Sequence, residues 1–88
     1  MIRRRLTVHG RVQGVFFRDS LRRLAEREGV AGWARNSADG TVEAVFEGEP
    51  GSVERLVDYS RLGPPDASVE RVDVADEPPE GLAGFQIG

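Results

Sequence analysis

Strand-like and helix-like spacings of apolar residues follow one another along this chain, and their order restricts the fold more than any other feature of the sequence. Apolar and polar residues alternate over Ile2–Gly10, which predicts a half-buried strand with Leu6 and Val8 on its apolar face. Helical spacing begins at Phe17 and continues to Gly29, a residue that suits the left-handed conformation at the end of a helix. The first third of the chain is therefore predicted to be strand, loop and helix.

A pair of strands is expected after this helix. Strand-like runs over Val30–Asn36 and Thr41–Glu47 flank a short segment that ends in Asp39-Gly40. An Asp-Gly pair between two such runs is a strong signal for a tight turn, because glycine adopts positive φ at no steric cost. We therefore predict an antiparallel hairpin.

The last third of the chain contains a second helical stripe and further strand-like runs. The helix begins near Pro50 and cannot continue past Gly63-Pro64-Pro65, because proline lacks a backbone N–H and clashes with the preceding turn. Ser68–Asp76 alternates imperfectly and is predicted to be a strand. Phe85–Ile87 is long enough for a short strand at the edge of the sheet.

The predicted order is β-α-β-β-α-β, which is typical of the ferredoxin-like split βαβ fold. In that fold class, α+β, a four-stranded antiparallel sheet carries both helices on one face. A chain of 88 residues has room for one hydrophobic core, so we expect a single domain over residues 1–88.

Composition excludes several kinds of chemistry. The chain has no Cys, which excludes disulfides and thiolate metal sites and favours a reducing, cytoplasmic location. Its 12 basic residues are all Arg, so Schiff-base chemistry and a phosphate-binding lysine are absent. A formal net charge of −3 argues against nucleic-acid binding, and no apolar stretch approaches the length of a membrane span. We expect a monomer.

The loop between the first strand and the first helix has the composition of an anion site. Gly10 and Gly14 permit close backbone approach, and the N-terminus of a helix directs N–H groups and a positive dipole outward. Arg18, at the start of the helix, adds a planar and permanently charged donor. These residues suit the binding of phosphate or a similar anion, but they are also typical of an ordinary turn with a solvated Arg18, and more turns of this composition are of the second kind.

Two longer motifs make the prediction specific. Val-His-Gly-Arg-Val-Gln-Gly-Val-Phe-Phe-Arg, at residues 8–18, resembles the first signature of the acylphosphatase family. Gly-Trp-Ala-Arg-Asn-Ser-Ala-Asp-Gly-Thr-Val, at residues 32–42, resembles the second. The similarity extends to Gly48, Gly63-Pro64-Pro65, Val69–Val72 and Phe85–Ile87, and no motif position departs from the family pattern.

The resemblance implies a metal-free enzyme that hydrolyses acyl phosphates to a carboxylate and inorganic phosphate. By position, Arg18 binds the substrate phosphate and Asn36 orients the attacking water. The phosphate is also expected to bind backbone amides of the loop, those of Gln13, Gly14, Val15, Phe16 and Phe17. Phe17 and Trp33 are predicted to lie in the core, and His9 at the rim of the site or in a structural role.

Other functions remain open from the sequence. An RNA-recognition module shares the element order but requires aromatic and basic residues where Thr41–Glu47 has acidic ones. A non-catalytic module could use the same loop to bind a phosphate-bearing ligand without turnover, and a carbamoyl-phosphate-handling domain of a larger enzyme uses a similar loop. The carboxylates of Asp73, Asp76, Glu77 and Glu80 are interpreted as a solvated acidic edge without chemistry.

Overall fold

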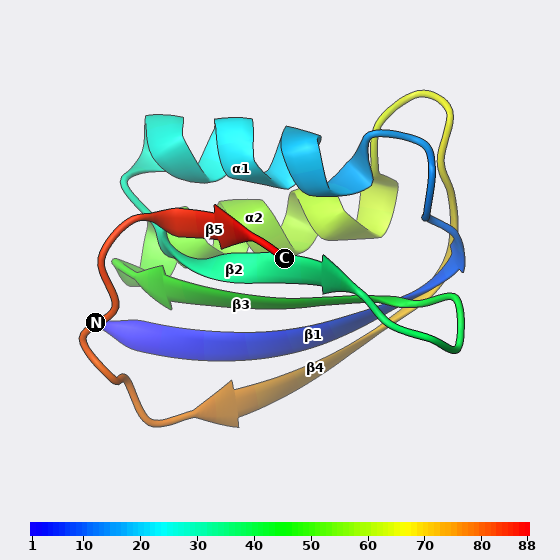
Figure 1. Ribbon diagram of the computed structural model, residues 1–88. Coiled ribbons are helices and arrows are strands. Elements are labelled where there is room, and N and C mark those ends of the chain that lie inside the picture. The colour runs from blue at the N-terminus through cyan, green and yellow to red at the C-terminus, as the bar shows by residue number, and fades with distance from the viewer.

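The computed structural model describes residues 1–88 and arranges them in two layers, a sheet and a pair of helices on one of its faces (Figure 1). The elements in chain order are β1 (Ile2–Arg11), α1 (Phe17–Glu28), β2 (Ala31–Asn36), β3 (Val42–Gly48), α2 (Pro50–Leu62), β4 (Ser68–Glu77) and β5 (Phe85–Ile87). Every predicted element is present, and the ends of the helices and strands lie within one residue of the prediction.

The strands lie in the order β4-β1-β3-β2-β5. The predicted antiparallel sheet of four strands is confirmed, since β1 pairs with β3 and β4, and β2 pairs with β3, all antiparallel. The short fifth strand is also present and is parallel to β2, which makes the sheet mixed. Parallel pairing arises because the connector at residues 78–84 passes the end of the sheet before β5 starts at the opposite edge (Figure 1).

The core lies between the sheet and the helices. Each helix has one buried face. The buried residues are Phe17, Leu21 and Ala25 in α1, and Val53, Leu56, Val57 and Ser60 in α2. Removing a leucine side chain such as Leu21 or Leu56 from water stabilises the fold by about 2 kcal/mol. The predicted helical stripes are therefore the faces that hold the two layers together.

The ends of α1 are set by two residues with positive φ. Phe16 precedes the helix at φ 63°, and Gly29 follows it at φ 69°, as the sequence predicts for the closing glycine. Neither helix is long and apolar enough to cross a membrane.

Trp33 corrects one prediction, because it does not belong to the buried core. It is half-buried on the sheet face opposite the helices, with the guanidinium carbons of Arg5 and Arg35 at 5.3 and 5.1 Å from its ring centroid. Its neighbours Gly32 and Ala34 are the buried residues of β2. Alternation along a strand places Trp33 on the other face, where cation–π contacts replace core packing.

Candidate active site

The loop between β1 and α1 is held in a tight curve. Gly14 has φ 73° and Phe16 has φ 63°, so two residues of this short segment adopt the left-handed conformation. Within the segment Val12 and Val15 are buried and Gly14 is exposed, so the loop is anchored to the core at two points. The first backbone N–H groups of α1 lack partners within the helix and face this side of the molecule, where the helix dipole favours an anion.

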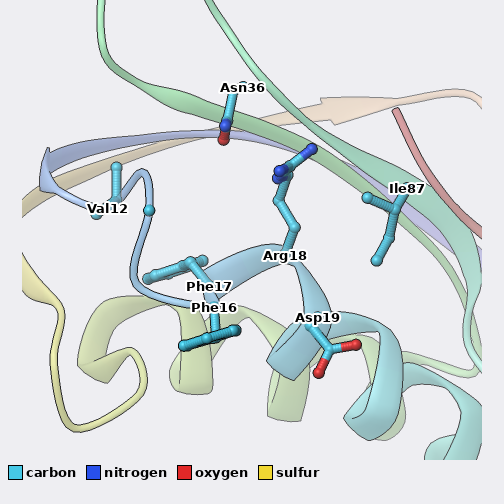
Figure 2. A pocket seen from close by; sticks show the side chains of 8 residues that line it. Val12, Phe16, Phe17, Arg18, Asp19, Asn36 and Ile87 are labelled. Atoms are coloured by element: carbon cyan, nitrogen blue, oxygen red, sulfur yellow. The ribbon is translucent and has the colours of Figure 1, made fainter.

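Arg18 lies in the first turn of α1, and its side chain extends from the helix beside the loop (Figure 2). Its Nη1 donates a hydrogen bond to the carbonyl oxygen of Gly88, just after β5. In Figure 2 the guanidinium points toward Asn36, with Ile87 on one side and the loop on the other. The C-terminal strand therefore helps to determine where this cation lies.

Asn36 is the last residue of β2 and faces the loop (Figure 2). The turn that follows it is fixed by Asp39, whose Oδ1 accepts hydrogen bonds from the Thr41 hydroxyl at 2.6 Å and the Thr41 N–H at 3.1 Å. The bond from the hydroxyl, followed by that from the N–H, lowers the pKa of Asp39 below its ordinary value. The hairpin thus holds Asn36 at a defined place beside the helix N-terminus.

Gln13 joins the two segments that carry the site. Its Nε2 donates to the carbonyl oxygens of Ser37 at 2.8 Å and Thr41 at 3.0 Å, so the loop is tied to the hairpin. Only the backbone amide of Gln13 was predicted to take part in the site, and this side-chain contact was not. A glutamine side chain offers two N–H donors, and here both meet backbone acceptors.

A cavity of about 270 Å³ opens between the loop, α1 and the end of β2 (Figure 2). It is lined by Val12, Gly14, Phe16, Phe17, Arg18, Asp19, Asn36 and Ile87. Most of the predicted site residues therefore meet at one cavity. The side chains of Gln13 and Val15 do not line it, and only their backbones belong to the predicted site. Val12, Asp19 and Ile87 were not predicted.

Charge in the cavity comes from two side chains. Arg18 is the one cation among the lining residues. The carboxylate of Asp19 is paired with Arg22 at 2.6 Å and with Arg23 at 3.0 Å, on the helix itself. His9, expected at the rim or in a structural role, lies outside the cavity and contacts Asp73 at 2.9 Å. No group of three or more potential metal-ligating side chains occurs in the structure.

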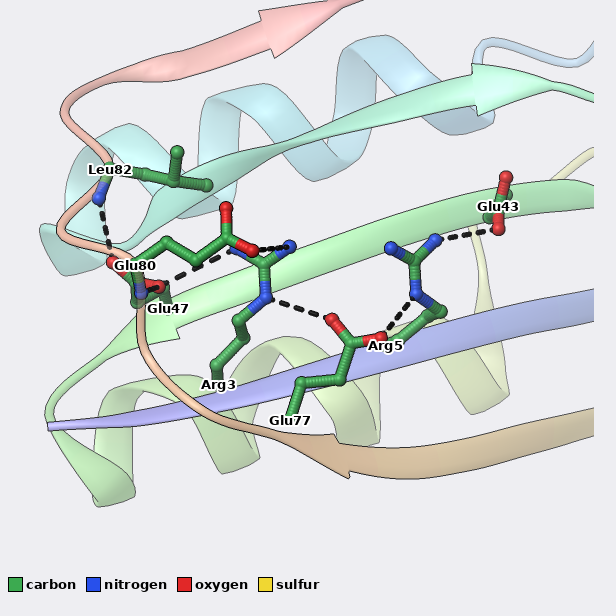
Figure 3. A network of polar contacts seen from close by, with 7 residues as sticks. All are labelled: Arg3, Arg5, Glu43, Glu47, Glu77, Glu80 and Leu82. Carbon is green, nitrogen blue, oxygen red and sulfur yellow. Dashed lines mark hydrogen bonds and ion pairs between the residues drawn. The ribbon is translucent and has the colours of Figure 1, made fainter.

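A network of ion pairs on the open face of the sheet secures the connector to β5 (Figure 3). Glu47 is fully buried, and its carboxylate accepts hydrogen bonds at 2.7 Å from the backbone N–H groups of Glu80 and Leu82. Arg3 lies 3.5 Å from Glu47 and 2.9 Å from Glu77. The connector is therefore fixed before it reaches β5, and β5 contributes Ile87 to the cavity.

Glu77 has a structural role that the sequence analysis did not predict. It bridges Arg3 at 2.9 Å and Arg5 at 2.7 Å, while Arg5 also pairs with Glu43. The hydrogen bonds from Arg5 and then Arg3 lower the pKa of Glu77. Its interpretation as part of a solvated acidic edge is wrong, because Glu77 is only partly exposed and pairs with strand β1.

Comparison with known proteins identifies the family. The sequence profile described as Acylphosphatase matches residues 4–87. The chain belongs to the acylphosphatase family. An acylphosphatase of Gloeobacter violaceus is 56% identical over 86 residues, 98% of this chain and 92% of that protein. One of Rubrobacter xylanophilus is 61% identical over 94% of this chain and 76% of its own length.

A solved structure agrees with the sequence comparison. The crystal structure of acylphosphatase from Bacillus subtilis is similar at a TM-score of 0.96 and 35% identity, covering 100% of this chain and 99% of that one. Membership in the acylphosphatase family, the ferredoxin-like fold and acyl phosphate hydrolysis are thereby confirmed as predicted. The cavity between the loop, α1 and the end of β2 brings together a cation, a glycine of the loop and an amide side chain.

Proposed function

We propose that this acylphosphatase binds the phosphoryl group of its substrate at Arg18 and the backbone N–H groups of residues 13–17, and that Asn36 orients the attacking water. The observation that carries the proposal is that Arg18 and Asn36 line one cavity above the loop at the N-terminus of α1. A guanidinium and backbone N–H groups are strong donors to phosphate oxygens.

In the proposed reaction, the water oxygen forms a bond to phosphorus while the bond from phosphorus to the acyl oxygen breaks. The electron pair of the broken bond leaves with the carboxylate. Because an acyl phosphate already has a good leaving group, the protein needs mainly to place the phosphoryl group, neutralise its oxygens and align the water.

Asn36 supplies hydrogen bonds to the water and no proton transfer, since a neutral amide is not a base. The proton of the water passes to a phosphate oxygen of the substrate, which leaves as inorganic phosphate. Arg18 and the loop supply the charge that a metal ion provides in other phosphoryl-transfer sites, so the proposed reaction requires neither metal nor cofactor.

The test is hydrolysis of benzoyl phosphate by the purified protein in the presence of a metal chelator. We expect rapid turnover by the wild type and a loss of at least roughly 100-fold in kcat for Asn36→Ala, with inorganic phosphate still inhibiting at a similar concentration. Asn36 is the only asparagine of the chain, so the matched control is Gln86→Ala, an exposed amide on β5 outside the cavity.

Three results would contradict the proposal. Loss of wild-type activity with the chelator would show that a metal is needed. Unchanged kcat in Asn36→Ala would remove its role in orienting water. Phosphate binding without turnover in the wild type would identify a non-catalytic anion-binding module.

A further inference from the structure

Phe16 has a large apolar side chain that does not pack in the core. Its exposed fraction is 77%, whereas that of its neighbour Phe17 is 1%. Its backbone is in the left-handed region at φ 63°, the one non-glycine residue of the chain with positive φ. A bulky L-residue is unfavourable in that conformation, and an exposed ring gains nothing from burial to offset the strain.

The conformation of Phe16 is maintained by the start of α1. Its carbonyl oxygen accepts hydrogen bonds from the Ser20 N–H at 3.0 Å and the Ser20 hydroxyl at 2.9 Å. These bonds fix the backbone but do not require an aromatic side chain, since any residue supplies the same carbonyl. The ring itself therefore calls for another explanation, and its place in the wall of the cavity provides one.

A second exposed apolar side chain lines the same cavity. Ile87, at the end of β5, is 36% exposed, and Figure 2 shows it on the other side of Arg18 from the loop that carries Phe16. A ligand whose phosphate lies at Arg18 extends its remaining part outward from the cation. Phe16 and Ile87 are the two exposed apolar groups that it can meet there.

The charges of the lining residues also favour a ligand with an apolar group beside its phosphate. Arg18 is the one cationic side chain in the cavity, and in the proposed reaction it is engaged by phosphate. The other charged lining residue, Asp19, is acidic. A second anionic group on the ligand would therefore find no cation beside the phosphate, while an uncharged apolar group would find two apolar side chains.

We propose that Phe16 and Ile87 form a contact surface for the acyl group, and that the enzyme thereby favours phosphates of apolar, above all aromatic, carboxylic acids. This inference rests on the proposed placement of the phosphoryl group at Arg18. An aromatic acyl group can stack on or against the edge of the Phe16 ring, whereas an acetyl group is too small to cover it.

The test compares kcat/KM for benzoyl phosphate and acetyl phosphate in the wild type, Phe16→Asn and Phe16→Leu. Asparagine tolerates the left-handed backbone, so Phe16→Asn removes the ring without adding strain. The measured quantity is the ratio of the two kcat/KM values, because any change in how the loop binds phosphate affects both substrates alike. We expect the benzoyl-to-acetyl ratio to fall roughly threefold to tenfold in Phe16→Asn and less in Phe16→Leu.

Two further variants sharpen the test. Ile87→Ala should lower the ratio in the same direction. Leu62→Ala is the matched control, because Leu62 is 73% exposed and lies outside the cavity, and its ratio should equal that of the wild type. A wild-type ratio in Phe16→Asn, with both substrates turned over, overturns this inference and leaves the proposed function standing. Absence of turnover of either substrate by the wild type overturns both.

Discussion

The side-chain amide of Gln13 donates a hydrogen bond to the backbone carbonyl of Thr41 at 3.0 Å, which ties the loop before α1 to the hairpin after Asn36. A second hydrogen bond, from the same amide to the Ser37 carbonyl at 2.8 Å, joins the same two segments. The proposed phosphate site and the proposed water-orienting residue lie on segments far apart in sequence. Gln13 therefore helps to fix the distance between these two segments, on which the in-line attack in the proposed reaction depends.

We expect Gln13→Leu to lower kcat by roughly 10-fold while changing the inhibition by inorganic phosphate much less, because small misplacements of a catalytic group reduce rate more than affinity. The carbonyl oxygens of Ser37 and Thr41 would each lose one hydrogen bond but keep one from a backbone N–H, so thermal stability should fall modestly. Steady-state kinetics and a thermal melt test both expectations. Gln86→Leu, on the exposed surface of β5, is the control. An unchanged kcat would show that the two segments hold their distance without this bond.

Arg18 offers a second prediction, about the kind of cation that the site needs. Arg18→Ala should reduce kcat/KM by at least roughly 100-fold and weaken inhibition by phosphate, since hydrogen bonds to charged groups contribute about 1.5–3 kcal/mol each. Arg18→Lys should recover little, because an ammonium cannot present a planar fork to phosphate oxygens. Arg61→Ala, in the last turn of α2, controls for the change in net charge. Full activity of Arg18→Lys would mean that charge alone is sufficient.

Gly14 tests whether the loop needs its left-handed backbone. A Cβ at this position would meet no atom within 4 Å, so collision with the protein is not the obstacle. At φ 73° a valine costs about 1–2 kcal/mol of strain, and its side chain would enter the cavity where the phosphate is proposed to bind. We expect Gly14→Val to fold with reduced stability and to lose most of its activity.

Gly29→Val is the matched control for Gly14→Val. Gly29 has φ 69°, its added Cβ would also meet nothing within 4 Å, and it lies at the other end of α1. Both variants should lose a similar amount of thermal stability, but only Gly14→Val should lose phosphate binding. Equal loss of activity in the two variants would assign the effect to strain in α1 and not to the cavity.

Features set by local spacing were predictable from the sequence. The stripe of α1, its closing Gly29 and the Asp39-Gly40 turn depend on neighbours within a few residues, and the structure confirms each. Trp33 was misplaced because its hydrophobicity was weighed above the alternation of its strand. Ile87 was missed as a lining residue because its position depends on β5 pairing with β2, a contact that no local pattern specifies.

Glu47 was missed for a related reason. An acidic residue in a predicted strand suggests a solvated face, yet the connector covers it completely. The hydrogen bonds from the backbone N–H groups of Glu80 and, second, Leu82 lower the pKa of Glu47 below its ordinary value despite burial. A carboxylate whose pKa is lowered on folding stabilises the protein above its unfolded pKa, and that contribution is lost as the pH falls through the folded pKa.

The last prediction follows from the lowered pKa of Glu47. Glu47→Gln should lower Tm on the order of 10 °C at pH 7, because the two N–H groups donate to different carboxylate oxygens, whereas an amide has one acceptor oxygen and no charge to pair with Arg3. The difference in Tm between wild type and variant should shrink as the pH is lowered from about 5, near the ordinary pKa of a glutamate, through the lowered pKa of Glu47 in the folded protein. Thermal melts across this range test it, with Glu26→Gln on the exposed surface of α1 as control. A difference that stays constant with pH would mean that the shape of the side chain, and not its charge, anchors the connector.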